Sequence, residues 1–73
     1  MIIDPKTRLQ EYSLKKYKIL PIYKLISNTG PRHKPTFKIA VKLKDSKFVS
    51  AKGYSKKDAE QKAASLLLQE ENI

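Results

Sequence analysis

Residues 37–44 alternate apolar and polar side chains almost without interruption. Successive side chains of a β-strand point to opposite faces, so this pattern places the apolar ones against a core and the lysines in water. A single half-buried strand is not stable alone, because its apolar face needs a covering layer and its backbone needs neighbouring strands. The pattern therefore predicts a sheet that other elements cover on one face.

Two more strands are predicted beside this one. Residues 22–27 are rich in β-forming side chains, and residues 47–52 follow a tight turn at Asp45-Ser46 that pairs them with the middle strand. The composition of residues 28–31 predicts the turn after the first strand, and Gly53 is expected to break the third. Such short connections favour an antiparallel meander.

A helix is predicted before the strands. Asp4 supplies an N-cap oxygen and Pro5 suits the first helical position, so the helix is expected over residues 5–17. The helical period places Leu9 and Tyr12 toward the core.

A second helix is predicted after the strands. Ser55 begins it, and Asp58 stands at the capping-box position three residues later. The helical period predicts one apolar stripe, made of Ala59, Ala63, Leu66 and Leu67. Together these elements predict an α+β fold of order α-β-β-β-α, in which both helices pack on one face of a three-stranded antiparallel sheet.

A chain of 73 residues allows one domain, expected over residues 4–71 with flexible ends at 1–3 and 72–73. It has no Cys and one His, which excludes disulfides and cysteine or His-based metal sites, so the fold depends on apolar packing. No apolar run reaches the roughly 20 residues of a membrane span, and no secretory segment is present. We therefore expect no membrane partner and a cytoplasmic location.

The charge balance points to a polyanionic partner. Sixteen Lys and Arg against seven Asp and Glu give a net charge of +9. Residues 12–57 contain thirteen of these basic residues and a single acid, Asp45. The alternative interpretation is an ordinary solvated surface.

Lys56 and Lys57 are the sharpest anomaly. They occupy the first turn of the second helix, where the helix dipole favours acids, while Glu70 and Glu71 occupy the last turn, where it favours bases. A helix N-terminus with two lysines suits phosphate, and Ser55 lies beside them. The alternative is two solvated lysines whose charge Asp58 compensates.

Two more polar regions are candidates for contact with a ligand. The loop before the middle strand is stiffened by two prolines and carries Pro31, Arg32, His33 and Lys34, which suit sugar or phosphate contacts in a groove. The outward side of the first helix carries Thr7, Gln10 and Glu11, which can contact 2′-OH groups. The alternatives are an exposed hairpin loop and an ordinary wet helix face, and the residue chemistry alone favours the latter.

Catalysis finds no support in the residues. Asp58 and Glu60 are the closest inner carboxylates and lie two positions apart on a helix, so they face different ways. No Ser–His–Asp set stands out, and we predict no catalytic residue, metal ligand or cofactor. Two distant glycines do not supply a KH loop, and the aromatic pattern of an RRM is absent.

Three motifs carry a resemblance to a known family. Residues 4–12 (DPKTRLQEY) look like the first-helix motif of ribonuclease III, and residues 53–64 (GYSKKDAEQKAA) are similar to the second-helix signature of double-stranded-RNA-binding domains. The strand and loop markers of these domains are matched by Pro21, Tyr23, Gly30-Pro31, His33 and Phe37. The chain therefore resembles the double-stranded-RNA-binding domain, and most of all the C-terminal domain of bacterial ribonuclease III.

This resemblance implies binding to the A-form duplex through three regions. The first helix (Thr7, Gln10, Glu11) would lie in one minor groove and the loop (Pro31, Arg32, His33, Lys34) in the next, while Ser55, Lys56 and Lys57 would grip phosphates between them. Such a domain spans roughly 16 bp and recognises shape more than sequence. Glu60 departs from the pattern, since many members outside ribonuclease III carry Lys there.

The resemblance also implies a parent protein, a magnesium-dependent endoribonuclease that processes ribosomal and messenger RNA. That parent would be a homodimer through a nuclease domain absent from this chain, so the chain itself would be a monomer that cleaves nothing. Two other functions remain open: a protein-interaction or dimerisation module of the same fold, and a general polyanion binder.

Overall fold

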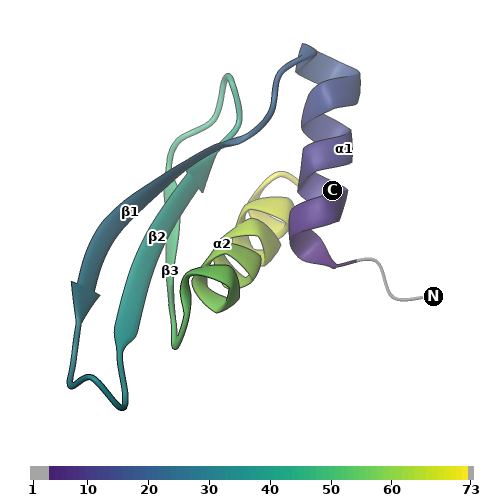
Figure 1. Cartoon of the computed structure of the whole chain (residues 1–73). Helices are drawn as coiled ribbons and strands as arrows, with labels where there is room; N and C mark the ends of the chain where they lie inside the picture. Colours follow the sequence, from purple (N-terminus) through teal and green to yellow (C-terminus); the bar gives the residue numbers. More distant parts are fainter. Residues whose placement is uncertain (1–3, 73) are drawn as a thin grey trace.

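The structure, a computed structural model, describes residues 4–72 and has the predicted α+β architecture (Figure 1). Five elements follow one another along the chain: α1 (Pro5–Tyr17), β1 (Ile22–Thr29), β2 (Thr36–Lys42), β3 (Val49–Gly53) and α2 (Lys56–Glu70). Of the ends predicted to be flexible at 1–3 and 72–73, residues 1–3 and Ile73 lie outside the described residues, and Asn72 lies in a turn. The flexible ends and the domain bounds stay a prediction.

The sheet is a three-stranded antiparallel meander in the order β1-β2-β3. Figure 1 shows both helices on the same side of it, as predicted. Ile26 is the extra residue of a β-bulge in β1, because Leu25 pairs with Ile39 while Ser27 pairs with the adjacent Lys38. The opposite side of the sheet is left without a covering element among residues 4–72.

The core lies between the sheet and the two helices. Leu9 is fully buried and Tyr12 is packed against the core, as the helical period predicted. The core cluster combines both helices with β2 and the residue after it, and consists of Leu9, Val41, Leu43, Ala63, Ala64, Leu67 and Leu68. Ser13 is also buried, and its hydroxyl donates a hydrogen bond to the carbonyl oxygen of Ile19 at 2.6 Å. This bond removes the cost of burying the hydroxyl.

The strand ends differ from those predicted. β1 extends through Asn28 and Thr29, which were predicted as turn residues, because both pair with β2. β2 ends at Lys42, so Lys44 lies in a turn, and β3 begins only at Val49. The connection is therefore longer than the predicted tight turn at Asp45-Ser46. The Ser46 hydroxyl accepts a hydrogen bond from the Leu43 N–H at 2.8 Å, which replaces a sheet partner there.

Gly53 was predicted to break the third strand, and this is wrong. It is the last residue of β3 and pairs with Phe37. A β-carbon at this buried position would lie 2.5 Å from the Ala59 nitrogen and 2.6 Å from the Asp58 carboxylate. Glycine is therefore present because the end of β3 lies directly against the first turn of α2.

The predicted apolar stripe of α2 is wrong at one position. Ala59, Ala63 and Leu67 are buried as predicted, but Leu66 is 42% exposed, and Ala64 and Leu68 are buried instead. α2 packs against α1 as well as against the sheet, so its buried face turns toward α1 and away from Leu66. Within residues 4–72, neither helix combines the length and apolarity that crossing a membrane requires.

Candidate nucleic-acid interface

The β1–β2 loop and the N-terminus of α2 lie at the same end of the sheet, and α1 lies beside α2 (Figure 1). Thr29 pairs with Thr36 beside the β1–β2 loop, and the neighbouring Phe37 pairs with Gly53 at the end of β3. The N-terminus of α2 follows Gly53 after only two residues, so the loop and the start of α2 are neighbours (Figure 1). The start of α1 contacts α2 directly, because the Lys6 ammonium lies 2.8 Å from the Glu60 carboxylate.

The predicted residues of α1 are accessible to a ligand. Thr7, Gln10 and Glu11 are exposed, on the side of the helix away from the buried Leu9. The Asp4 carboxylate caps the helix by accepting a hydrogen bond from the Thr7 N–H at 2.7 Å, as predicted. This bond is the main reason that the pKa of Asp4 is lowered.

The β1–β2 loop also presents its predicted residues to solvent. Gly30 adopts φ +93°, a left-handed conformation that suits glycine, and the Lys34 N–H donates a hydrogen bond to the Pro31 carbonyl at 2.9 Å. This bond closes a turn around Arg32 and His33. All four predicted residues of the loop, Pro31 to Lys34 in sequence, are exposed.

The N-terminus of α2 is capped as predicted. The Ser55 hydroxyl accepts a hydrogen bond from the Asp58 N–H at 3.0 Å. Asp58 reaches back to the Tyr54 N–H at 3.1 Å, one residue before the cap, and forms an ion pair with Lys62 at 3.1 Å. Lys56 and Lys57 are exposed in the first turn, whose N–H groups point out of the helix. The lysines and the helix dipole therefore present positive charge to the same side.

Asp58 gives this end of α2 a defined response to acid. The hydrogen bond from the Tyr54 N–H, and then Lys62, lower the pKa of Asp58 below its ordinary value of 3.8. Its stabilising effect is therefore present above that value and is lost as the pH falls through the lower pKa of the folded state. We expect Asp58→Asn, which keeps an acceptor, to reduce the loss of Tm between about pH 7 and about pH 2. Circular dichroism melting at each pH measures this, and an unchanged loss would contradict it.

A junction centred on Lys6 joins the start of α1 to α2. The Lys6 ammonium forms an ion pair with Glu60 at 2.8 Å, and the Lys6 N–H donates a hydrogen bond to the Gln61 side chain at 2.9 Å. The same ammonium lies 5.3 Å from the centre of the Tyr23 ring. Burial, and then the charges of Glu60 and Asp4, raise the pKa of Tyr23 to about 12. The junction therefore joins the start of α1 to the first half of α2, the helix that begins with Lys56 and Lys57.

This junction was missed in the sequence, because Lys6 and Glu60 are 54 residues apart and no local pattern links them. The junction also gives a reason for Glu60, a position where many members of the family outside ribonuclease III carry Lys. Its carboxylate forms the ion pair with Lys6. Lys62, two residues after Glu60, forms its ion pair with Asp58.

We expect the Lys6–Glu60 pair to couple the two helices measurably. A double-mutant cycle with Lys6→Met and Glu60→Gln is expected to give an interaction energy of about 0.5–1 kcal/mol, at the upper end for a partly exposed pair. Urea unfolding of the four proteins measures it. An interaction energy near zero would show that the contact does not hold the helices together.

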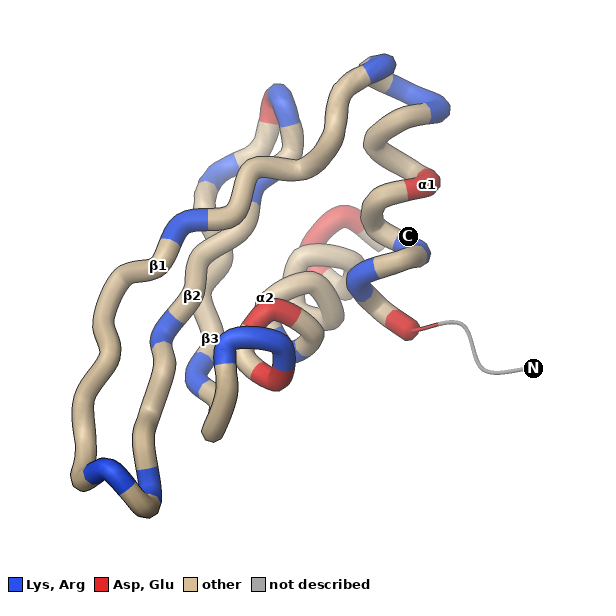
Figure 2. Tube along the Cα trace, in the orientation of Figure 1, with Lys and Arg blue, Asp and Glu red and all other residues tan. Residues whose placement is uncertain are grey.

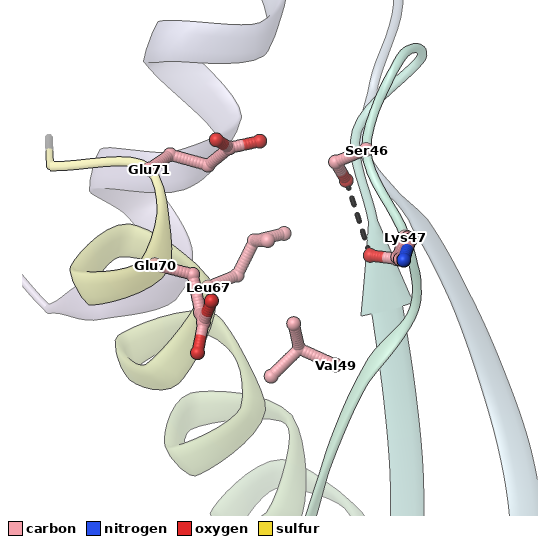
Figure 3. A pocket seen from close by; sticks show the side chains of 6 residues that line it. All are labelled: Ser46, Lys47, Val49, Leu67, Glu70 and Glu71. Atoms are coloured by element: carbon pink, nitrogen blue, oxygen red, sulfur yellow. Dashed lines mark hydrogen bonds between the residues drawn. The ribbon is translucent and has the colours of Figure 1, made fainter.

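The end of the molecule opposite the β1–β2 loop has a hollow that acidic residues line in part. A hollow of about 160 Å³ lies between the β2–β3 connection and the end of α2 (Figure 3). Two glutamates contribute to its lining, which consists of Ser46, Lys47, Val49, Leu67, Glu70 and Glu71. These acids make it a poor place for a polyanion, so the three predicted regions remain the best candidate. Across residues 4–72, His and acidic side chains form no group of three or more suited to a metal ion.

Comparison with known proteins gives an independent view of the chain. The family model for the double-stranded RNA binding motif matches residues 5–71. Over 68 residues, 93% of this chain, it is 76% identical to Ribonuclease 3 of Pelagibacter ubique (strain HTCC1062). Over 61 residues, 84% of this chain, it is 54% identical to Ribonuclease 3 of Leptospira interrogans. The matched segments span only 31% and 25% of those two relatives.

A solved structure agrees with the family match. The solution structure of DRB4 dsRBD2 is similar to this one with a TM-score of 0.67 and 32% sequence identity. The similarity covers 96% of this chain and 97% of the other. The α-β-β-β-α arrangement is therefore shared over nearly the whole length of both chains.

Proposed function

Because this chain belongs to the double-stranded RNA binding motif family, we propose that it binds double-stranded RNA by the shape of the A-form duplex. The observation that carries this proposal is that α2 contacts α1 through Lys6 and begins beside the β1–β2 loop, so its lysine-bearing N-terminus lies between the other two exposed polar regions. This helix N-terminus is capped and carries two exposed lysines. A backbone of regularly spaced phosphates and 2′-OH groups is the ligand that matches such a surface.

Each region has a part that its chemistry supports. Thr7, Gln10 and Glu11 supply hydroxyl, amide and carboxylate groups for 2′-OH groups and base edges in one minor groove. The loop from Pro31 to Lys34 enters the next minor groove with Arg32 and His33 at its tip. Ser55, Lys56 and Lys57 hold phosphates across the major groove between them. The Lys6 junction keeps the first and third regions in register with each other.

The parent protein is also a proposal, since this chain matches only a part of its relatives. We propose that the domain delivers RNA to the nuclease domain of a magnesium-dependent, homodimeric endoribonuclease that processes ribosomal and messenger RNA in the cytoplasm. The chain described here is then a monomeric binding domain without a cofactor.

Competition between duplexes tests the proposal. A roughly 20-bp RNA duplex and the DNA duplex of the same sequence are titrated against the chain at equal ionic strength. We expect RNA to bind clearly better, because B-form DNA offers neither the 2′-OH groups nor the same groove spacing. Equal affinities would instead mean general attraction of a +9 chain to polyanions. Binding to neither duplex would favour a protein-interaction module.

A further inference from the structure

The sheet face opposite the helices carries a regular array of lysines. Strand pairing sets Lys24 of β1 beside Ala40 of β2, and sets Lys38 of β2 directly opposite Lys52 of β3. Lys42 belongs to the same face, two residues beyond Ala40. The other face of β2 carries Ile39 and Val41, which are buried under the helices. Four lysines from three strands therefore point away from the core.

This lysine face is unusual because its charge is not balanced. None of the three strands contains an acidic residue, and Figure 2 shows only basic and uncharged positions along them. The two ion pairs among residues 4–72 both involve α2, and neither includes a strand lysine. Lys38 and Lys52 are a like-charge pair directly opposite each other, which destabilises a sheet. A local cost of this kind is a common sign of a functional surface.

The geometry of the lysine face suits an extended polyanion. Lys38 and Lys42 are four residues apart on β2, about 13 Å at the rise of a strand, while neighbouring strands lie about 5 Å to each side. Ala40 at the centre is only 3% exposed although it faces outward. Long lysine stems can cover apolar surface of this kind while their ammonium groups stay in water. None of the strand residues on this face is aromatic, and the Phe48 ring in the β2–β3 connection lies 5.7 Å from the Lys42 ammonium, so the face offers little surface for base stacking.

We propose that the lysine face binds the phosphate backbone of a second RNA duplex, so that one domain bridges two duplexes. The proposed first interface lies at the helices and the loop end, and the sheet stands between it and the lysine face (Figure 1). A duplex bound at the first interface therefore leaves the lysine face free. Contacts made only by lysine ammonium groups neutralise phosphates without reading bases, which predicts weaker and more salt-sensitive binding than at the first interface.

A bridging experiment tests this second site. Roughly 16-bp RNA duplexes, the length that one domain spans, are labelled separately with a donor and an acceptor dye and mixed in excess over the protein. We expect energy transfer between duplexes at about 50 mM salt that disappears by about 200 mM. Lys38→Gln/Lys52→Gln should abolish the transfer. Its affinity for a single duplex should stay within about twofold of the affinity of a control variant with the same net charge. That control, Lys44→Gln/Lys47→Gln, removes the same charge from the β2–β3 connection.

The variants separate this proposal from its alternatives. Relief of the Lys38–Lys52 repulsion should leave the Tm equal or higher, so loss of transfer would not reflect unfolding. Each pair of phosphate contacts makes the affinity fall by an extra factor of about twelve over this fourfold rise in salt. The affinity of Lys38→Gln/Lys52→Gln for a second duplex should therefore fall about twelvefold less than that of the unaltered protein. No transfer in the unaltered protein, or equal loss in the control variant, would overturn the second site. Capture by anionic vesicles that depends on Lys38 and Lys52, without bridging of RNA, would assign the face to lipid instead.

The same experiment distinguishes failure of the second site from failure of the proposed function. Lys56→Ala/Lys57→Ala should remove both the strong binding of one duplex and the bridging. If that variant changes neither, the first interface is misplaced, whatever the lysine face does. If it weakens single-duplex binding while Lys38→Gln/Lys52→Gln still permits bridging, only the second site fails.

Discussion

Replacing Lys56 and Lys57 with Ala is expected to weaken binding to duplex RNA roughly a hundredfold. Each lysine is exposed in the first turn of α2, beside N–H groups that point out of the helix. Charge-assisted contacts of this kind contribute about 1.5 kcal/mol or more each, and two of them account for the factor. Two fewer phosphate contacts should also lower the slope of log affinity against log salt by about 1.8.

Fluorescence titration of a roughly 20-bp RNA duplex at several salt concentrations measures both quantities. Lys44→Ala/Lys47→Ala is the matched control, because it removes two exposed lysines at the other end of the sheet. The control should show a small loss that depends on net charge alone. Equal losses in the two variants would show that the start of α2 has no special role. Unchanged melting of both variants ensures that the comparison concerns binding.

Gly53→Ala is expected to destabilise the fold by about 3 kcal/mol, the upper part of the range for overpacking. The added carbon would lie 2.5 Å from the Ala59 nitrogen and 2.9 Å from its α-carbon, and backbone atoms of a helix do not move aside easily. A domain of this size has only about 3–5 kcal/mol of stability, so the variant should be close to unfolded at room temperature.

Urea unfolding measures the loss, with Ser50→Ala as the control at an exposed position of the same strand. The control should change the stability by no more than about 0.5 kcal/mol. Where Gly53→Ala remains folded, α2 must move away from β3, and RNA affinity should fall even though no contact residue is altered. A variant as stable as the control would show that β3 and α2 can separate without cost.

The element order could be predicted from the sequence because its signals are local. Three signals each depend on residues only a few positions apart in the chain. They are the alternation around Ile39 and Val41, the helix start at Asp4-Pro5 and the Ser55 cap. All three were confirmed. The strand ends were predicted less well, since Thr29 extends β1 through pairing with Thr36 on another strand. Such pairing leaves no trace in the composition of the segment itself.

The candidate site was also predicted only in part from the sequence. The types of residue suited to RNA could be predicted from charge and from the family resemblance, and the structure shows them exposed. Their direct contact with RNA stays a prediction. The Lys6 junction was not predicted, because it joins residues from three elements far apart in the chain. The repulsive Lys38–Lys52 pair was likewise hidden until strand register was known.

By itself, the sequence determined which segments form helices and strands and that the chain carries a large excess of positive charge. These properties depend on neighbours along the chain and on simple sums. Only the tertiary structure decided that Gly53 must be glycine, that Leu66 faces outward, that Glu60 is committed to Lys6, and that four strand lysines share one face. Each of these depends on a partner that folding brings close, and the energies of such contacts are set by distances in space.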